Sequence, residues 1–175
     1  FMNTTMMVTL LGAAASDALE SGQVVSGVGG QYNFVAMSHA LNDARLIMML
    51  RATHDNKDGL TSSIVWNYGN VTIPRHLRDV VITEYGVAEL RGRSDGEVVK
   101  RLIAVADSRF QADLVKQAKA HGKLDAHYEI PERYRRNLPN VLADTLQPWA
   151  EAELLPDFPF GTDLTPDELK IVRAL

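Results

Sequence analysis

The sequence predicts an α/β domain with a mostly parallel or mixed sheet, flanking helices and a Pro-rich C-terminal arm. Two apolar runs contain neither glycine nor proline, RLIMMLRA at residues 45–52 and VVIT at residues 80–83. Such runs are typical of strands that are buried on both faces of a sheet. Two segments with helix-start signals follow after residue 93, and strands followed by helices favour an α/β domain.

The remaining elements of the first half are assigned in chain order. Residues 3–11, NTTMMVTLL, are interpreted as a buried strand, with a helix as the alternative for so short an apolar run. Val24 and Val25 are expected to form a short strand that runs into a cluster of glycines. We expect a helix at 33–41, a loop in the turn-rich segment 53–61, and a further strand at 63–68.

Two later helices are marked by the residues at their starts. Ser94 and Glu97 have the three-residue spacing of a capping box, in which each side chain accepts a hydrogen bond from the other residue's backbone N–H. Ser108 and Gln111 repeat this spacing, and Gly122 follows the second helix as a stop signal.

The C-terminal segment is much richer in proline than the rest of the chain. Six of the seven prolines lie in the last 45 residues, and Thr165-Pro166-Asp167-Glu168 predicts a short helix there. We therefore expect residues 1–122 to form the α/β domain. Residues 123–175 are expected to form an extended arm with short helices that packs on the same domain.

Composition limits the class of protein. A chain of 175 residues has the size of one domain, and its net charge of -4 argues against a nucleic-acid binder. No apolar run reaches the roughly 18 residues that a membrane-spanning helix needs. The absence of cysteine excludes disulfides, thiolate zinc ligands and cysteine nucleophiles, and is compatible with a cytoplasmic location. The histidines lack metal-binding spacings, so no metal site is expected.

The glycine turn GVGGQY, residues 27–32, is the first candidate ligand site. It differs from the dinucleotide fingerprint because Tyr32 stands at the third glycine position, and no Lys-Ser/Thr pair follows as in a nucleotide-binding P-loop. Glycines let a ligand approach the backbone closely, and the free N–H groups at a helix start favour an anionic or oxyanionic atom. The alternative, a turn required only for tight packing, remains open.

Glu84 is the second candidate. It follows the apolar run at 80–83, and ligands of open α/β sheets bind outside the carboxyl ends of strands. A carboxylate at this place can act as an acid, a base or a hydrogen-bond acceptor. The alternative is a structural ion pair with Arg91 or Arg93. Ser26 lies outside any GxSxG motif, so a hydrolase triad has no support.

Two stretches together resemble a known family. SGVGGQYNFV at residues 26–35 and VVITEYGVAELRGRS at residues 80–94 are similar to signatures of the C-terminal domain of the acetyl-CoA hydrolase/transferase family. That family includes acetyl-CoA hydrolases, 4-hydroxybutyrate CoA-transferases and succinyl-CoA:acetate CoA-transferases. The resemblance covers residues 1–122, and the Pro-rich arm looks like the tail of a bacterial subgroup.

The resemblance implies a fold, a reaction and a set of site residues. The fold would be the open α/β fold of CoA-transferase domains. The reaction would transfer an acyl group through a glutamyl-CoA thioester, with coenzyme A thioester as substrate and no cofactor. The turn would form an oxyanion hole and seat the thioester, Glu84 would assist the nucleophile or substrate, and Lys57 would touch CoA. The expected turn residues are Gly27, Gly29, Gly30 and Gln31.

The resemblance also implies that this chain is part of a longer enzyme. The nucleophilic glutamate of the family lies upstream of the glycine turn, and Glu20 does not match its motif. We expect the chain to be inactive alone. Its expected partners are acyl-CoA, a small carboxylate or water, the missing N-terminal part of the enzyme, and further copies in a homo-oligomer. A non-catalytic CoA-binding or dimerisation module is the alternative, as is a different enzyme that uses Glu84 as a base.

Overall fold

The computed structural model describes residues 1–57 and 59–174, which form two compact units, one up to residue 138 and one from residue 139 to residue 174. The first unit contains all the strands and the helices α1, α2 and α3. The second contains two helices, α4 (Pro139–Glu151) and α5 (Pro166–Ala174). Within the described residues, no helix is both long enough and apolar enough to cross a membrane.

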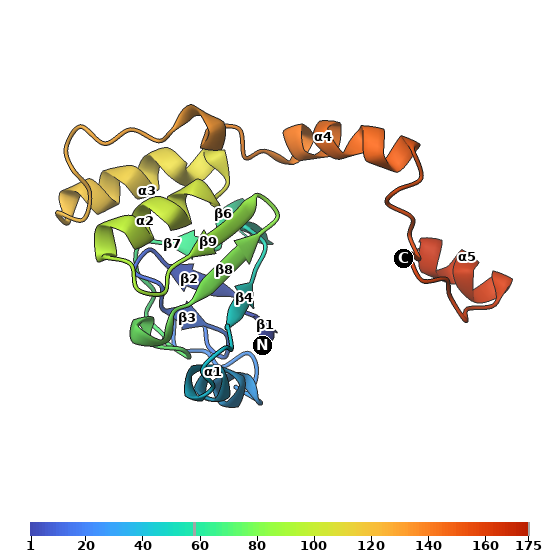
Figure 1. Ribbon diagram of the computed structural model, residues 1–175, viewed down its shortest axis with the longest axis horizontal. Coiled ribbons are helices and arrows are strands. Elements are labelled where there is room, and N and C mark those ends of the chain that lie inside the picture. The colour runs from blue at the N-terminus through green and yellow to red at the C-terminus, as the bar shows by residue number, and fades with distance from the viewer. Residues whose placement is uncertain (58, 175) are drawn as a thin grey trace. The chain divides into compact units, whose positions relative to one another are not determined.

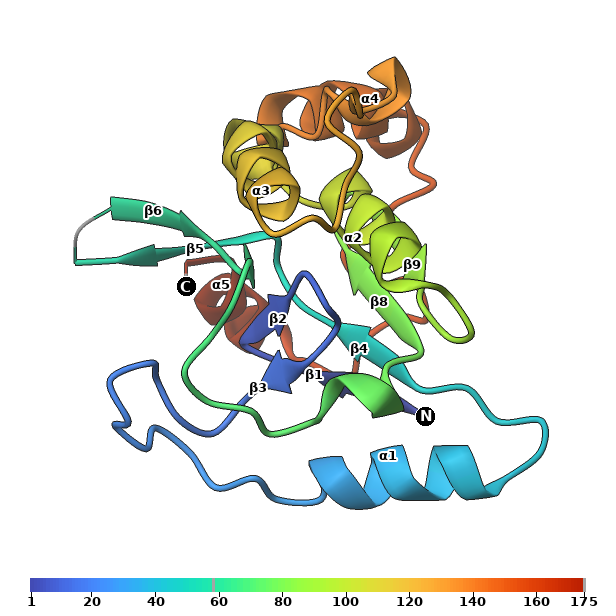
Figure 2. The same cartoon turned by 90° about the vertical axis from the view of Figure 1, so that its left-hand side faces the viewer.

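The main sheet of the first unit is mixed and open (Figure 1). Its order is β1-β4-β8-β9, with β1, β4 and β8 parallel and β9 antiparallel to β8. Figures 1 and 2 place α1 on one side of these strands and the pair α2 and α3 on the other. The predicted α/β architecture with flanking helices is therefore confirmed. The strands are β1 (Met2–Thr4), β4 (Ile47–Met49), β8 (Val80–Thr83) and β9 (Gly86–Glu89).

The interpretation of residues 3–11 as one strand is wrong. The chain leaves the main sheet after Thr4 and enters a second sheet, of order β3-β2-β7. The backbone N–H of Thr5 still donates to Met49 in the main sheet, whereas that of Met6 donates to Ala15 in the second sheet. The run alone does not show this transfer, because the hydrogen-bond partners of the two halves lie outside it. The strands are β2 (Met7–Thr9), β3 (Ala14–Ala15) and β7 (Ile64–Val65).

Two further expectations in the first half are corrected. The segment 53–61 contains an antiparallel pair, β5 (Thr53–Asn56) and β6 (Gly59–Ser62), instead of a plain loop. Val24 and Val25 form no strand in the described structure. Val24 makes only an isolated bridge to Ala18, and both valines are exposed. The following helix is confirmed as α1 (Gln31–Ala40), which begins directly after the glycine turn.

Of the two predicted capping boxes after residue 93, the structure bears out the N-cap of the first and not that of the second. Ser94 caps α2 (Asp95–Ala104), and its side chain accepts a hydrogen bond from Glu97 N–H, as predicted. The cap of α3 (Ser108–Ala120) is Asp107 and not Ser108. Gln111 is buried and donates to backbone carbonyls instead of completing a capping box.

The core is one cluster of buried side chains to which both sheets and the helices α1, α2 and α3 contribute. Its fully buried side chains come from segments far apart in sequence, and residues 123–138 also contribute, because Leu124 is buried in the same cluster. How residues 139–175 pack on the domain remains a prediction. A short 3-10 helix, Arg75–Leu77, precedes β8, and another, Glu132–Tyr134, lies after α3. The largest fully buried apolar side chains are Leu10, Leu46, Ile64, Ile73, Leu90, Leu102 and Ile103.

In the second unit, the predicted helix start at residues 165–168 is confirmed. The backbone N–H of Thr165 donates to Glu168 Oε2 at 2.8 Å, and Glu168 N–H donates to Thr165 Oγ1 at 3.4 Å. This reciprocal pair is a capping box at the start of α5.

Candidate active site

The carboxyl ends of the three parallel strands meet at one edge of the main sheet. We call this the carboxyl edge; it consists of Thr4-Thr5, Met49-Leu50 and Thr83-Glu84, which stand at the ends of β1, β4 and β8. The strands are held in register by Thr5 N–H, which donates to Met49 O at 3.0 Å, and Leu50 N–H, which donates to Ile82 O at 3.1 Å. Ligands of open α/β sheets bind at such an edge.

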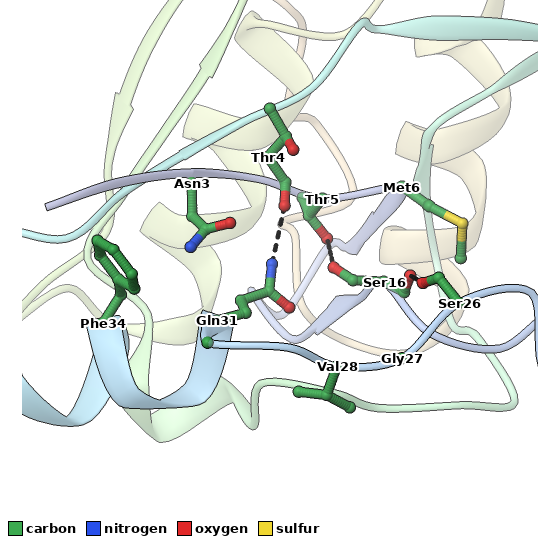
Figure 3. Close-up of a pocket in the computed structure, with 11 residues that line it drawn as sticks. Asn3, Thr4, Thr5, Met6, Ser16, Ser26, Gly27, Val28, Gln31 and Phe34 are labelled. Carbon is green, nitrogen blue, oxygen red and sulfur yellow. Dashed lines mark hydrogen bonds between the residues drawn. The ribbon is translucent and has the colours of Figure 1, made fainter.

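Two cavities open at the carboxyl edge, and both are lined by Thr4 and Thr5. The first, of about 360 Å³, lies against the glycine turn, and we call it the turn cavity (Figure 3). The second, of about 500 Å³, lies against Glu84, and we call it the glutamate cavity. The end of β1 therefore separates the two features that the sequence singled out. The turn cavity is lined by Asn3, Thr4, Thr5, Met6, Ser16, Ser26, Gly27, Val28, Gly30, Gln31 and Phe34.

The glycine turn is open on its ligand-facing side. A Cβ atom added at Gly27 or Gly29 would meet no atom within 4 Å. Gly29 has a φ of 58°, in the left-handed region that favours glycine, so the turn itself requires glycine there. Within the described residues, the backbone N–H groups of Gly27, Val28, Gly29 and Gly30 donate to no protein acceptor. The turn thus presents free donors beside a cavity.

Helix α1 adds to this property of the turn. Its N-cap is Gly30, which has no side chain to cap the first N–H groups, and its first turn contains no acidic residue. The positive end of the helix dipole is therefore not compensated by a carboxylate and favours a negatively charged atom nearby.

Glu84 is held by the backbone of a neighbouring strand end. Its Oε2 accepts a hydrogen bond of 2.8 Å from Ala52 N–H, and the residue is exposed. The alternative pairing with arginine is not found among the described ion pairs. Arg91 instead lies 3.8 Å from Asp79 and donates to Ala44 O.

The turn that contains Glu84 is fixed by hydrogen bonds of the two residues that flank it. Thr83 Oγ1 donates to Val105 O at 2.7 Å, and Tyr85 OH donates to the buried Asp107 at 3.0 Å. Burial, together with this hydrogen bond to a carboxylate, raises the pKa of Tyr85, so the phenol stays protonated. Burial favours a higher pKa for Asp107, but hydrogen bonds from Arg109 outweigh it and hold this pKa below its usual value. The Glu84 backbone is thus anchored on both sides.

The structure brings together part of the residue set expected from the sequence. Gly27, Gly30 and Gln31 line the turn cavity, whereas Gly29 shapes the turn without lining it. Glu84 lies at the same edge in the adjacent cavity. Lys57 lies apart from both cavities, exposed after the end of β5.

Sequence reasoning missed the polar residues that complete the turn cavity. Thr5, Ser16 and Ser26 line this cavity. The hydroxyls of Thr5 and Ser16 are hydrogen-bonded to each other, and the Ser26 hydroxyl donates to the backbone carbonyl of Ser16. The rule that ligands bind at strand ends would have found Thr4 and Thr5, had the break between β1 and β2 been recognised.

The comparisons with known proteins agree with this architecture. The family model of the acetyl-CoA hydrolase/transferase C-terminal domain matches residues 1–118. The chain is 32% identical over 126 residues to a succinyl-CoA:cyclohexane-1-carboxylate CoA transferase of Geobacter metallireducens, covering 70% of this chain and 28% of that protein. The chain therefore belongs to the acetyl-CoA hydrolase/transferase family, as a C-terminal domain.

Two solved structures are similar to this chain. RipA from Yersinia pestis matches with a TM-score of 0.61 and 30% identity, over 70% of this chain and 27% of that one. A 4-hydroxybutyrate CoA-transferase from Porphyromonas gingivalis matches with a TM-score of 0.52 and 26% identity, over 69% and 26%. The chain spans 27 to 28% of the length of the curated relatives it matches.

Proposed function

We propose that the chain is the C-terminal part of an acyl-CoA:carboxylate CoA-transferase or an acyl-CoA hydrolase, and that it supplies one side of the acyl-CoA site. The observation that carries the proposal is the position of the glycine turn and Glu84 at one carboxyl edge, in adjacent cavities that share Thr4 and Thr5. Membership in a family whose relatives bear CoA-transferase names supports it.

The proposed task of the glycine turn is to hold the thioester carbonyl. When a nucleophile attacks this carbonyl, negative charge develops on its oxygen, and fixed donors at that position stabilise the charge. The free N–H groups of residues 27–30 and the uncompensated start of α1 provide such donors. Because these groups are fixed by the fold, little reorganisation is needed as the charge develops.

The proposed task of Glu84 is to orient the substrate or the nucleophile. Its carboxylate is held by Ala52 N–H at one oxygen, which fixes its direction without neutralising its charge. Lys57 is proposed as a contact of CoA, whose phosphates would attract its ammonium group.

The nucleophile itself is proposed to lie outside this chain, in the N-terminal part of the longer enzyme. Glu20 precedes the turn but lines neither cavity. The other reactant would be a small carboxylate in a transferase, or water in a hydrolase. Coenzyme A acts in this proposal as part of the substrate and not as a cofactor. We further propose that the longer enzyme is a homo-oligomer located in the cytoplasm.

The test is the exchange of labelled acetate into acetyl-CoA. We expect exchange, or hydrolysis of acetyl-CoA if water is the acceptor, in the longer protein that carries this chain, and neither reaction in the 175-residue chain alone. Turnover by the isolated chain would contradict the missing nucleophile. If the longer protein binds CoA but turns over no acyl-CoA, the chain is a non-catalytic CoA-binding module instead.

A further inference from the structure

One buried polar atom in the turn cavity lacks a partner. Gln31 is 5% exposed, and its Oε1 is the atom that forms no hydrogen bond within the described part of the chain. Its Nε2 donates to Thr4 O at 2.8 Å (Figure 3). Because a carbonyl oxygen can only accept, the amide nitrogen must face Thr4, and this fixes the opposite position of Oε1. A buried acceptor without a donor is unfavourable, so a donor is expected from a ligand.

The hydroxyl groups of Thr5, Ser16 and Ser26 do not supply this donor. Thr5 Oγ1 lies 2.9 Å from both Ala15 O and Ser16 Oγ, and Ser26 Oγ donates to Ser16 O at 3.0 Å. Each hydroxyl carries one proton, and these protons are directed to other acceptors. These three hydroxyls are therefore bonded within the protein, and none of their protons is left for Gln31 Oε1.

We propose that Gln31 Oε1 accepts a hydrogen bond from the amide N–H of CoA that lies nearest the sulfur. This inference rests on the proposed function, which places the thioester carbonyl at the N–H groups of the turn. Gln31 directly follows Gly30, so its side chain and the donors of the turn belong to one short segment. In every CoA thioester, two methylene groups separate the sulfur from this amide nitrogen. One segment would then bind the thioester at both its carbonyl and its nearest amide.

The acyl group is a poorer source of the donor. Unsubstituted acyl groups such as acetyl and butyryl contain no N–H or O–H group, whereas the CoA amide is present whatever acyl group is carried. An acceptor for this amide therefore selects for CoA thioesters over simple thioesters, and it leaves the acyl group free to vary.

The experiment compares two small acetyl thioesters in the longer enzyme that carries this chain. S-acetyl-N-acetylcysteamine retains the amide of CoA, and its ester counterpart has oxygen in place of that N–H. We expect kcat/KM to be roughly tenfold or more higher for the amide, because the ester leaves Gln31 Oε1 without a donor. In Gln31→Met, which has similar length but no acceptor, the ratio should fall to near one. Tyr32→Phe, which changes an exposed neighbour, should keep the wild-type ratio.

The outcomes separate this inference from the proposed function. A wild-type ratio near one overturns the inference, and this result needs no variant. A high ratio that persists in Gln31→Met, or in Gln31→Leu if the first variant does not fold, assigns the amide to another acceptor and also overturns it. If the wild-type enzyme does not turn over acetyl-CoA, the proposed function itself fails.

Discussion

Replacing Gly27 with valine is expected to lower acyl-CoA turnover about a hundredfold or more in the longer enzyme, with the fold intact. Gly27 lines the turn cavity, and a Cβ at this position meets no atom within 4 Å. Its φ lies outside the left-handed region, so valine adds no backbone strain of that kind. The new side chain would occupy the space in which we place the thioester. A carbonyl that is kept away from the turn loses its donors, and loss of one oxyanion donor typically lowers turnover by about 10²–10³. Steady-state kinetics with acetyl-CoA and acetate measure the effect.

Two other glycine variants distinguish a side chain that fills the turn cavity from one that only strains the backbone. Gly29→Val is a weaker test, because Gly29 has a φ of 58° and any side chain is strained there. Gly22 has a φ of 83°, faces open space and lies outside both cavities. Gly22→Ala therefore imposes a similar backbone strain without filling the site, and it should retain turnover. Unchanged turnover in a folded Gly27→Val variant would reduce the turn to a structural role.

Replacing Glu84 with glutamine is expected to lower kcat by about a hundredfold, because the substrate or nucleophile loses its orientation, while the melting temperature changes little. Glutamine can still accept the hydrogen bond from Ala52 N–H through its side-chain oxygen, so the local structure should persist. What the variant removes is the negative charge at the carboxyl edge. The measurement is kcat and KM for acetyl-CoA, together with thermal unfolding.

Glu89 provides the matched control for Glu84. It lies on β9 in the same sheet, is exposed, lines neither cavity and is 4.0 Å from Arg45. Glu89→Gln removes the same charge away from the proposed site and should leave kcat within a factor of about two. Equal kinetics in both variants would return Glu84 to a structural role.

The sequence was sufficient where a local signal determines local structure. The apolar run at 80–83 became β8 with the same limits, and Ser94 caps α2 through the predicted contact. Hydrophobic runs and caps act over a few residues, so one sequence contains them. The glycine turn and the helix after it also follow from local preferences.

The sequence was not sufficient where distant partners decide. Residues 3–11 divide between two sheets because Thr5 N–H donates to Met49 O and Met6 N–H donates to Ala15 O, and no local pattern reports those hydrogen bonds. The same division creates the strand end that lies between the two cavities. The partner of Glu84, Ala52 N–H, also depends on the register of β4 and β8. Long-range register therefore decided the part of the site that sequence reasoning missed.

The most direct test of the central claim is the position of a bound acyl-CoA analogue. The longer enzyme would be crystallised with a CoA ketone in which methylene replaces the thioester sulfur, so that no bond can be cleaved. We predict that the ketone oxygen lies within hydrogen-bond distance of a backbone N–H in residues 27–30, at the carboxyl edge that carries Glu84. A ketone bound away from this edge, with the turn cavity empty, would contradict the assignment of the acyl-CoA site.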